Sequence, residues 1–152
     1  MNKKWIYLLC IVVLISFIFY KQYFGKDNLI KPPQISVKSS FGEVKPVLGP
    51  YSWEYRSLLG GKKYVQASSP IPPELVKDRN PLIVKSGGEL EIITIYKPAR
   101  LSVSIWQNNN KMSPKLNGNK IVAPKEKGKY VYSVSIKWKQ GIANYAFLVE
   151  VK

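Results

Sequence analysis

An uninterrupted run of uncharged, mostly apolar residues near the N-terminus constrains this chain most strongly. The run extends from Trp5 to Tyr20 behind Lys3 and Lys4, and continuing it through Lys21 to Phe24 gives twenty residues. A helix of about 20 apolar residues spans the hydrocarbon core of a bilayer, and a lysine near its end can extend its ammonium group to the lipid headgroups. We therefore expect residues 5–24 to form a membrane anchor, with residues 1–4 in the cytoplasm.

A cleaved secretory signal begins in a similar way, so the residues after the run decide between the two. Signal peptidase needs small residues in an Ala-x-Ala-like pattern, whereas residues 17–24 are almost all bulky. We therefore expect the helix to be retained. Cys10, the single cysteine, follows Leu8 and Leu9 inside the run, which is not the arrangement of a lipidated cysteine. We interpret it as one more apolar helix residue.

Positive charge flanks the run on both sides, so the charge bias alone hardly fixes its orientation. An apolar segment with only four residues before it usually sends the long C-terminal portion across the membrane, whatever the charge of that portion. We therefore expect a single-pass protein of the cell membrane, with residues 25–152 on the extracytoplasmic face.

The part after the anchor is long enough for one domain but not comfortably for two. Residues 25–34 are polar and contain Pro32-Pro33, which favours an extended linker, so we expect the domain at residues 35–152. Proline and glycine then recur at short intervals, and no stretch between them keeps the spacing of an amphipathic helix. This pattern predicts an all-β domain.

Apolar residues alternate with polar or smaller ones from Tyr130 to Trp138 and again from Tyr145 to Val151, which predicts a hairpin with one buried face. Further candidate strands lie at residues 35–38, 43–48, 51–56, 63–67, 89–96, 101–106 and 120–122. This number of short strands with frequent turns favours an antiparallel β-sandwich of two sheets.

A local motif adds detail to this fold. Gly128-Lys129-Tyr130, just before the penultimate expected strand, resembles the corner of immunoglobulin-like domains in which Gly-x-Tyr precedes that strand. The resemblance covers about residues 120–151 and implies that the Tyr130 hydroxyl bonds to the backbone a few residues upstream. The family often has a disulfide cysteine two residues later, where this chain has Tyr132, so that disulfide is absent.

The order of motifs carries a second resemblance. Tyr51-Ser52-Trp53 ahead of the C-terminal hairpin is similar to small, mostly uncharacterised membrane-anchored proteins of Gram-positive bacteria with a β-sandwich exterior domain. This resemblance implies a location and a fold, and no activity.

The usual catalytic side chains are scarce. The chain has no histidine and no cysteine outside the anchor, which removes the commonest general base, the thiolate nucleophile and most zinc ligands. Glu89 and Glu91 are the only close pair of carboxylates, and such a pair can share acid and base roles in glycoside hydrolysis. Their alternation with Leu90 and Ile92 favours a solvent-exposed strand face instead. We expect no catalytic site, no metal site and no cofactor.

Positive charge is the remaining signal. The chain has 24 basic and 9 acidic residues, a net charge of +15. From Lys97 onward it has eleven basic residues, and its acidic residues there are only Glu126 and Glu150. Such a field attracts anionic polymers or lipid headgroups, and salt weakens it. Outside a cell we expect an anionic cell-wall polymer, the membrane lipids or an envelope protein as partner, and not nucleic acid. A surface that serves only solubility is the alternative.

These observations predict a non-enzymatic envelope module whose binding residues are basic. A weak carboxylate-dependent hydrolase built on Glu89 and Glu91 remains an alternative, as does an accessory subunit whose sheet edge pairs with a partner strand. Trp106, beside residues 107–110, is a candidate aromatic contact at the rim of the site. The candidate basic residues are Lys125, Lys127, Lys129, Lys137 and Lys139.

Overall fold

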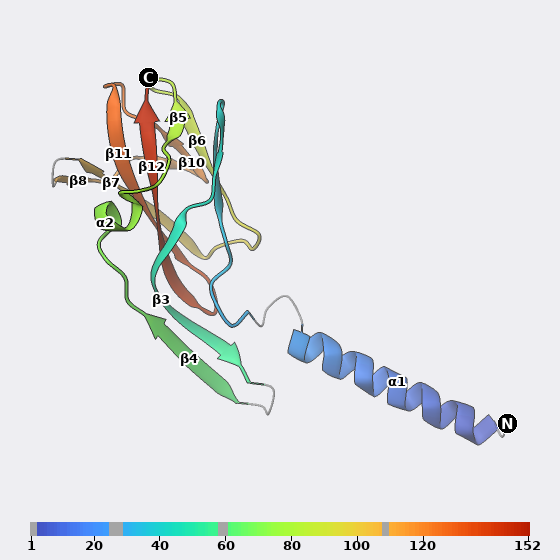
Figure 1. The fold of residues 1–152 in the computed structure, drawn as a ribbon. Coiled ribbons are helices and arrows are strands. Elements are labelled where there is room, and N and C mark those ends of the chain that lie inside the picture. Colours follow the sequence, from blue (N-terminus) through green and yellow to red (C-terminus); the bar gives the residue numbers. More distant parts are fainter. Residues whose placement is uncertain (1–2, 25–28, 58–60, 108–109) are drawn as a thin grey trace.

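The computed structural model describes residues 3–24, 29–57, 61–107 and 110–152 (Figure 1). Helix α1 (Lys3–Phe24) contains the apolar run, and no part of its span is buried by the rest of the chain. Within the described residues α1 is the one helix long and apolar enough to cross a membrane, a property that N-terminal signal sequences share.

The residues after α1 form two sheets that face each other as in a sandwich (Figure 1). The first sheet has the order β2 (Gly42–Val44), β1 (Ser36–Ser39), β6 (Glu89–Ile93), β10 (Lys120–Val122) and β9 (Leu116–Asn117). The second has the order β4 (Lys62–Ala67), β3 (Val47–Arg56), β12 (Gly141–Val151), β11 (Gly128–Lys137), β7 (Arg100–Gln107) and β8 (Asn110–Met112). All these pairings are antiparallel.

Two short elements complete the second sheet. Strand β5 (Leu82–Val84) pairs in parallel with the C-terminal part of β12, beyond the part that pairs with β3. Helix α2 (Pro72–Val76) packs on β12 and β11, and Val76 is fully buried there. The helix therefore protects part of the outer face of this sheet from solvent.

The core lies between the two sheets and confirms the alternation seen in the sequence. Tyr132 and Phe147, opposite each other on β11 and β12, stack with ring centroids 5.1 Å apart. A buried aliphatic or phenylalanine side chain contributes about 1.5–3 kcal/mol, so these faces dominate the stability of the domain. The largest contributors in the core are Trp53, Tyr130, Tyr132, Tyr145, Phe147, Ile35, Leu90, Ile92, Ile121 and Ile136.

The tyrosine at residue 130 makes the hydrogen bond that its sequence motif implied. Its hydroxyl donates to the backbone oxygen of Glu126 over 2.9 Å, four residues upstream. Tyr132, two residues later, is fully buried, and within the described part of the chain its hydroxyl has no hydrogen-bond partner. Burial raises the pKa of Tyr132 far above its usual value, so this side chain stays neutral.

Strand β3 differs from the sequence prediction. Separate strands were expected at residues 43–48 and 51–56, but β3 continues through Gly49 and Pro50. Its register against β12 shifts opposite Asn144, so Pro50 lies at a bulge. Proline has no backbone N–H to donate, and at a bulge the pairing of the two strands does not need one. A Cβ on Gly49 would lie 3.2 Å from the Asn144 backbone oxygen, so this close approach favours glycine.

Four of the short elements were not predicted, although the three-residue strand β10 was expected at residues 120–122. Helix α2 begins with two prolines and has five residues, too few to show a helical period. Strands β5, β8 and β9 have three residues or fewer, and β5 has a parallel partner far away in the sequence. The expected strand at 89–96 ends at Ile93.

Gly141, at the start of β12, is packed so tightly that only glycine fits. A Cβ there would overlap the backbone oxygen of Ser52 on β3. We expect Gly141→Ala to lower the free energy of unfolding by about 3 kcal/mol, because the two strands must separate. Lys139→Ala, an exposed change in the same turn, should alter it by less than about 0.5 kcal/mol. Denaturant titration of both variants in detergent measures the difference, and equal stability would contradict the close approach.

Candidate functional site

Three aromatic side chains at one end of the domain hold the segment that leads from α1, and we call them the tether clamp: Trp53, Trp138 and Tyr145. The indole N–H of Trp53 donates to the backbone oxygen of Leu29 over 2.7 Å. The Tyr145 hydroxyl donates to the backbone oxygen of Pro33 over 2.7 Å. The Trp138 ring meets those of Trp53 and Tyr145 edge to face, at centroid distances of 5.7 and 6.4 Å.

The tether clamp shows that the chain joins the domain earlier than the sequence suggested. Residues 25–34 were expected to form a linker, yet residues 32 and 33 are both buried. The Gln34 side-chain amide also donates to the Pro46 backbone oxygen over 2.9 Å. Residues 29–34 therefore belong to the packed domain, and residues 25–28 lie outside the described part of the chain.

The three side chains of the clamp are buried, so their polar atoms need partners within the protein. Tyr145 is 1% exposed, so its hydroxyl needs a protein partner, and burial raises its pKa far above the usual value. Trp138 satisfies its indole N–H with the Tyr96 backbone oxygen at 3.2 Å. Every polar atom of the clamp thus bonds to backbone, which fixes where the tether enters the fold.

The clamp defines two ends of the domain. Trp53 pairs with Gly141 beside the β11–β12 turn, so we call this the tether end, and we call the opposite end, with Gly128 and the C-terminal Lys152, the far end (Figure 1). Strand β11 runs from the far end to the tether end. Its ten residues span about 30 Å at 3.4 Å each.

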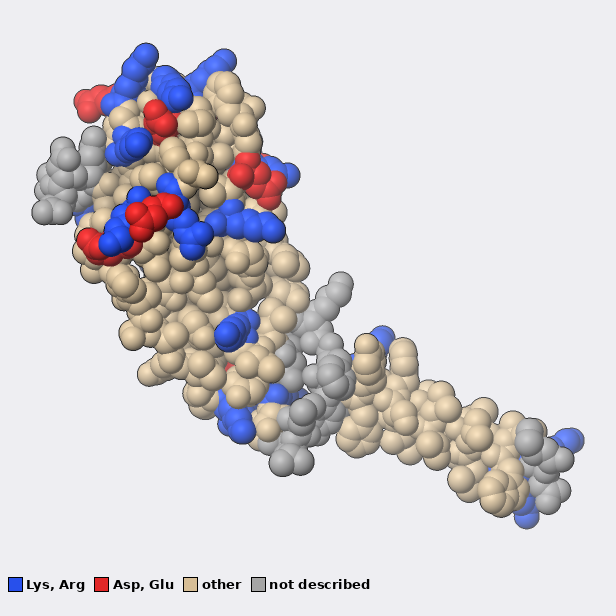
Figure 2. Space-filling model, in the orientation of Figure 1, with Lys and Arg blue, Asp and Glu red and all other residues tan. Residues whose placement is uncertain are grey.

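The candidate lysines predicted as one cluster therefore lie at both ends. Lys125, Lys127 and Lys129 are at the far end, whereas Lys137 and Lys139 are at the tether end. The prediction of a single surface was wrong, because alternate residues of a strand share a face while lying progressively farther apart. Figure 2 shows Lys and Arg side chains at both ends of the domain, with acidic side chains among them in the upper half.

At the far end, three segments bring five exposed lysines together, and we call them the far-end lysine group: Lys85, Lys125, Lys127, Lys129 and Lys152. The segments are joined by Ser86, whose hydroxyl donates to the Lys125 backbone oxygen over 2.6 Å. The Ser86 backbone N–H donates to the Lys152 backbone oxygen over 3.0 Å. Sequence reasoning missed Lys85, because only the parallel pairing of β5 with β12 brings it here.

Trp106 borders the far end on the outer face of the second sheet. It is half-buried and pairs with Val131 of β11, and Lys129 precedes Val131 by two positions on the same face. The Lys111 ammonium lies 5.7 Å from the centroid of the indole ring. The indole N–H is buried and has no partner among the residues that the structure describes. Residues 108–109, which were expected to flank it, lie outside those residues.

At the tether end, basic residues surround the clamp, and we call them the tether-end basic group: Lys31, Arg56, Lys62, Lys63, Lys97, Arg100, Lys137 and Lys139. All eight are exposed. Arg56 pairs with Lys62 across the β3–β4 hairpin, and Arg100 pairs with Lys137 across β7 and β11. Within the described residues Glu54 is the one carboxylate at this end.

Glu54 is held by two neighbours on β4. Its carboxylate accepts a hydrogen bond from the Tyr64 hydroxyl at 2.7 Å and lies 3.0 Å from the Lys62 ammonium. The Tyr64 hydrogen bond and the Lys62 ammonium favour the ionised form and lower the pKa of Glu54 below its ordinary value. Exposed lysines on this edge strand also oppose pairing with a further strand.

Glu89 and Glu91 lie on the outer face of the first sheet, as the alternation with buried Leu90 and Ile92 predicted. The Lys120 ammonium is 2.9 Å from Glu89. Glu91 lies between two lysines on the neighbouring strands and accepts a hydrogen bond from Asn119 at 3.2 Å. The register produces a row of alternating charge across four strands: Glu43, Lys38, Glu91 and Lys120. This arrangement gives both carboxylates a structural role.

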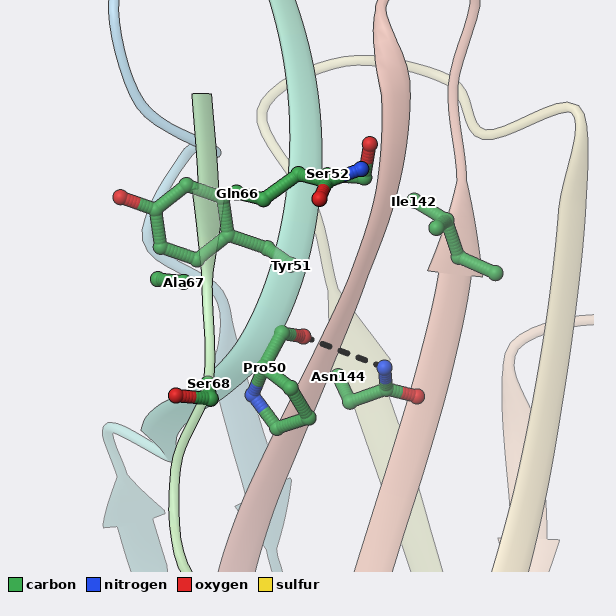
Figure 3. Close-up of a pocket in the computed structure, with 8 residues that line it drawn as sticks. All are labelled: Pro50, Tyr51, Ser52, Gln66, Ala67, Ser68, Ile142 and Asn144. Carbon is green, nitrogen blue, oxygen red and sulfur yellow. Dashed lines mark hydrogen bonds between the residues drawn. The ribbon is translucent and has the colours of Figure 1, made fainter. Parts of the chain in front are cut away.

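A shallow pocket of about 450 Å³ opens where β3, β4 and β12 meet at the β3 bulge (Figure 3). Its lining is uncharged, and the Asn144 side-chain amide donates to the Pro50 backbone oxygen over 3.1 Å at its rim. Sequence reasoning missed this pocket because two separate strands were expected at residues 43–48 and 51–56, where the structure has the single bulged strand β3. Its lining residues are Pro50, Tyr51, Ser52, Gln66, Ala67, Ser68, Ile142 and Asn144.

A scan against protein-family models found no match for this chain, and searches of curated proteins and of solved structures found no similar protein.

The clamp predicts a specific effect of removing one hydroxyl. We expect Tyr145→Phe to lower the free energy of unfolding by about 1–2 kcal/mol, because the Pro33 backbone oxygen loses its partner in a buried site. Hydrogen exchange of the backbone amides at residues 34–36 should accelerate. Tyr64→Phe, which removes an exposed hydroxyl, is the control and should leave that exchange unchanged. Unaltered exchange in Tyr145→Phe would show that the clamp does not hold the tether.

The Glu54 cluster predicts a pH dependence. Because its pKa is lowered in the folded state, its stabilising contribution is present above the unfolded-state pKa and is lost as the pH falls through the folded value. We expect wild type to be more stable than Glu54→Gln at neutral pH and low salt. The difference should vanish as the pH falls well below about 4. Thermal unfolding at a series of pH values measures it, and a difference independent of pH would contradict this role.

Proposed function

We propose that this chain is a membrane-anchored, extracytoplasmic and non-enzymatic β-sandwich module that binds an anionic polymer of the cell envelope through the far-end lysine group. Helix α1 is the anchor in this proposal, and its length and apolar composition support it. The hydrogen bond from Tyr130 to Glu126 supports an immunoglobulin-like form of the sandwich.

The observation that carries the proposal is the convergence of five exposed lysines from three segments at the end opposite the tether clamp. This position faces away from the site where the anchor joins the domain, so a polymer can reach it without contacting the bilayer. Glu126 and Glu150 offset only part of the charge, and the Glu150 carboxylate lies 3.9 Å from Lys152.

The chemistry of the far end fits a polymer better than a single small anion. Lysine is a flexible point charge, and five such charges from two loops, the start of β11 and the C-terminus suit repeated negative charges along a chain. The ring of Trp106, with Lys111 near it, adds an apolar surface beside these charges. Attraction of this kind weakens as salt rises.

The test uses the full chain in nanodiscs of phosphatidylcholine, a lipid without net charge, and a poly(glycerol phosphate) probe. We expect the double variant Lys127→Glu with Lys129→Glu to weaken binding by about tenfold or more, equivalent to about 1.4 kcal/mol. Raising the salt concentration should weaken binding of the wild type.

A charge-matched control makes this test specific. Lys63→Glu with Lys97→Glu changes the net charge by the same amount at the tether end and should weaken polymer binding much less. Neutral dextran should not bind. Equal losses in the two double variants would show that only net charge matters, and unchanged binding in the far-end variant would remove the proposal.

A further inference from the structure

We infer that the tether-end basic group binds the anionic lipid headgroups of the membrane that holds α1, so that the tether end of the domain contacts the surface of this membrane. The inference rests on the membrane anchoring proposed above and is independent of polymer binding at the far end.

The length of the tether limits how far this end can be from the bilayer. Helix α1 ends at Phe24, and the backbone of Leu29 is already bonded to Trp53 of the clamp. Five residue steps span at most about 18 Å, even when fully extended. The tether end therefore stays close to the headgroups, whereas the far end lies about 30 Å further along β11.

Charge at the tether end is almost all of one sign. Its eight exposed basic residues face Glu54 alone among the described carboxylates, and Glu54 is already paired with Lys62. The attraction of a basic residue to an anionic membrane falls off within the Debye length, about 8 Å at physiological salt. Only an end that can come near the surface can use this attraction, and the short tether keeps the tether end within reach of it.

Exposed apolar side chains among the cations point to a lipid surface. Ile30 follows the clamped Leu29 and is 60% exposed, and Ile95 is 73% exposed beside Tyr96, whose backbone oxygen bonds to Trp138. Tyr64, on the β3–β4 hairpin, is 68% exposed. A tyrosine suits the membrane interface, because its ring is apolar and its hydroxyl is polar. Exposed isoleucines mixed with lysines fit headgroups above a hydrocarbon layer better than a hydrophilic polymer.

The arrangement also places these groups around the tether. The β3–β4 hairpin carries Tyr64 on one side of the clamp, while Ile95 and Lys97 lie in the loop that the Trp138 indole contacts on the other side. Contacts on both sides of an attachment point resist tilting more than contacts on one side. The far end is then directed away from the membrane.

The test measures which end touches lipid, with the full chain in nanodiscs. Cys10→Ser removes the native thiol, and a fluorophore is placed at Ile95→Cys or, as the far-end control, at Glu126→Cys. Nitroxide-labelled lipids quench a fluorophore near the headgroups. We expect quenching at position 95 to be at least twofold stronger in discs with phosphatidylglycerol than in discs of phosphatidylcholine alone, and position 126 to remain unquenched.

Charge reversal provides the matched comparison. In the Ile95→Cys background, Arg100→Glu with Lys137→Glu should abolish the gain from phosphatidylglycerol, whereas Lys127→Glu with Lys129→Glu should leave it unchanged. Equal quenching in the two lipid compositions, or equal quenching at positions 95 and 126, would overturn the inference.

A separate measurement identifies failure of the anchoring itself. Alkaline extraction of vesicles releases proteins that do not span the bilayer, so release of the chain would remove the proposed anchor and this inference with it. Retention of the chain without selective quenching at position 95 would overturn only the inference about the tether end.

Discussion

The bond from the Trp53 indole to the Leu29 backbone, reinforced by the bond from Tyr145 to Pro33, is the constraint on which the arrangement of this molecule depends. Both donors belong to core aromatics, so the segment that follows α1 is held by the same side chains that hold the sandwich together. A tether held in this way limits how far each surface of the domain can lie from the end of α1. The effect of each charged group then depends on where it lies in the domain, and not only on the net charge of the domain.

The register of the strands determines which charged side chains have a neighbour of opposite charge. On the outer face of the first sheet, the register alternates Glu43, Lys38, Glu91 and Lys120, so opposite charges face each other across neighbouring strands. On α2, Glu74 lies 3.7 Å from Lys77. These pairs neutralise charge on the outer face of the first sheet and on α2. The excess of lysine and arginine is therefore concentrated at the two ends of the long strands.

Sequence reasoning succeeded where the signal is local. The period-two pattern predicted the faces of β11 and β12, and the Gly-x-Tyr motif predicted the hydrogen bond of Tyr130 with a partner four residues away. It failed where position depends on distant pairing. Lys85 lies near Lys152 through the parallel pairing of β5, and the pocket lies at the β3 bulge opposite Asn144. Lys129 and Lys137 look alike in sequence, but the length of β11 separates them.

This separation allows the two ends to act independently. About 30 Å of β11 lies between them, roughly four Debye lengths at physiological salt, so an anion at one end is largely screened from cations at the other. In the proposed arrangement, lipid headgroups at the tether end therefore leave the potential of the far-end lysine group nearly unchanged. A domain with one mixed basic surface would lose its polymer affinity as it settled on the membrane. Under the two proposals made above, cations at opposite ends of the long strands avoid that competition, because the clamp joins only the tether end to the segment that follows α1.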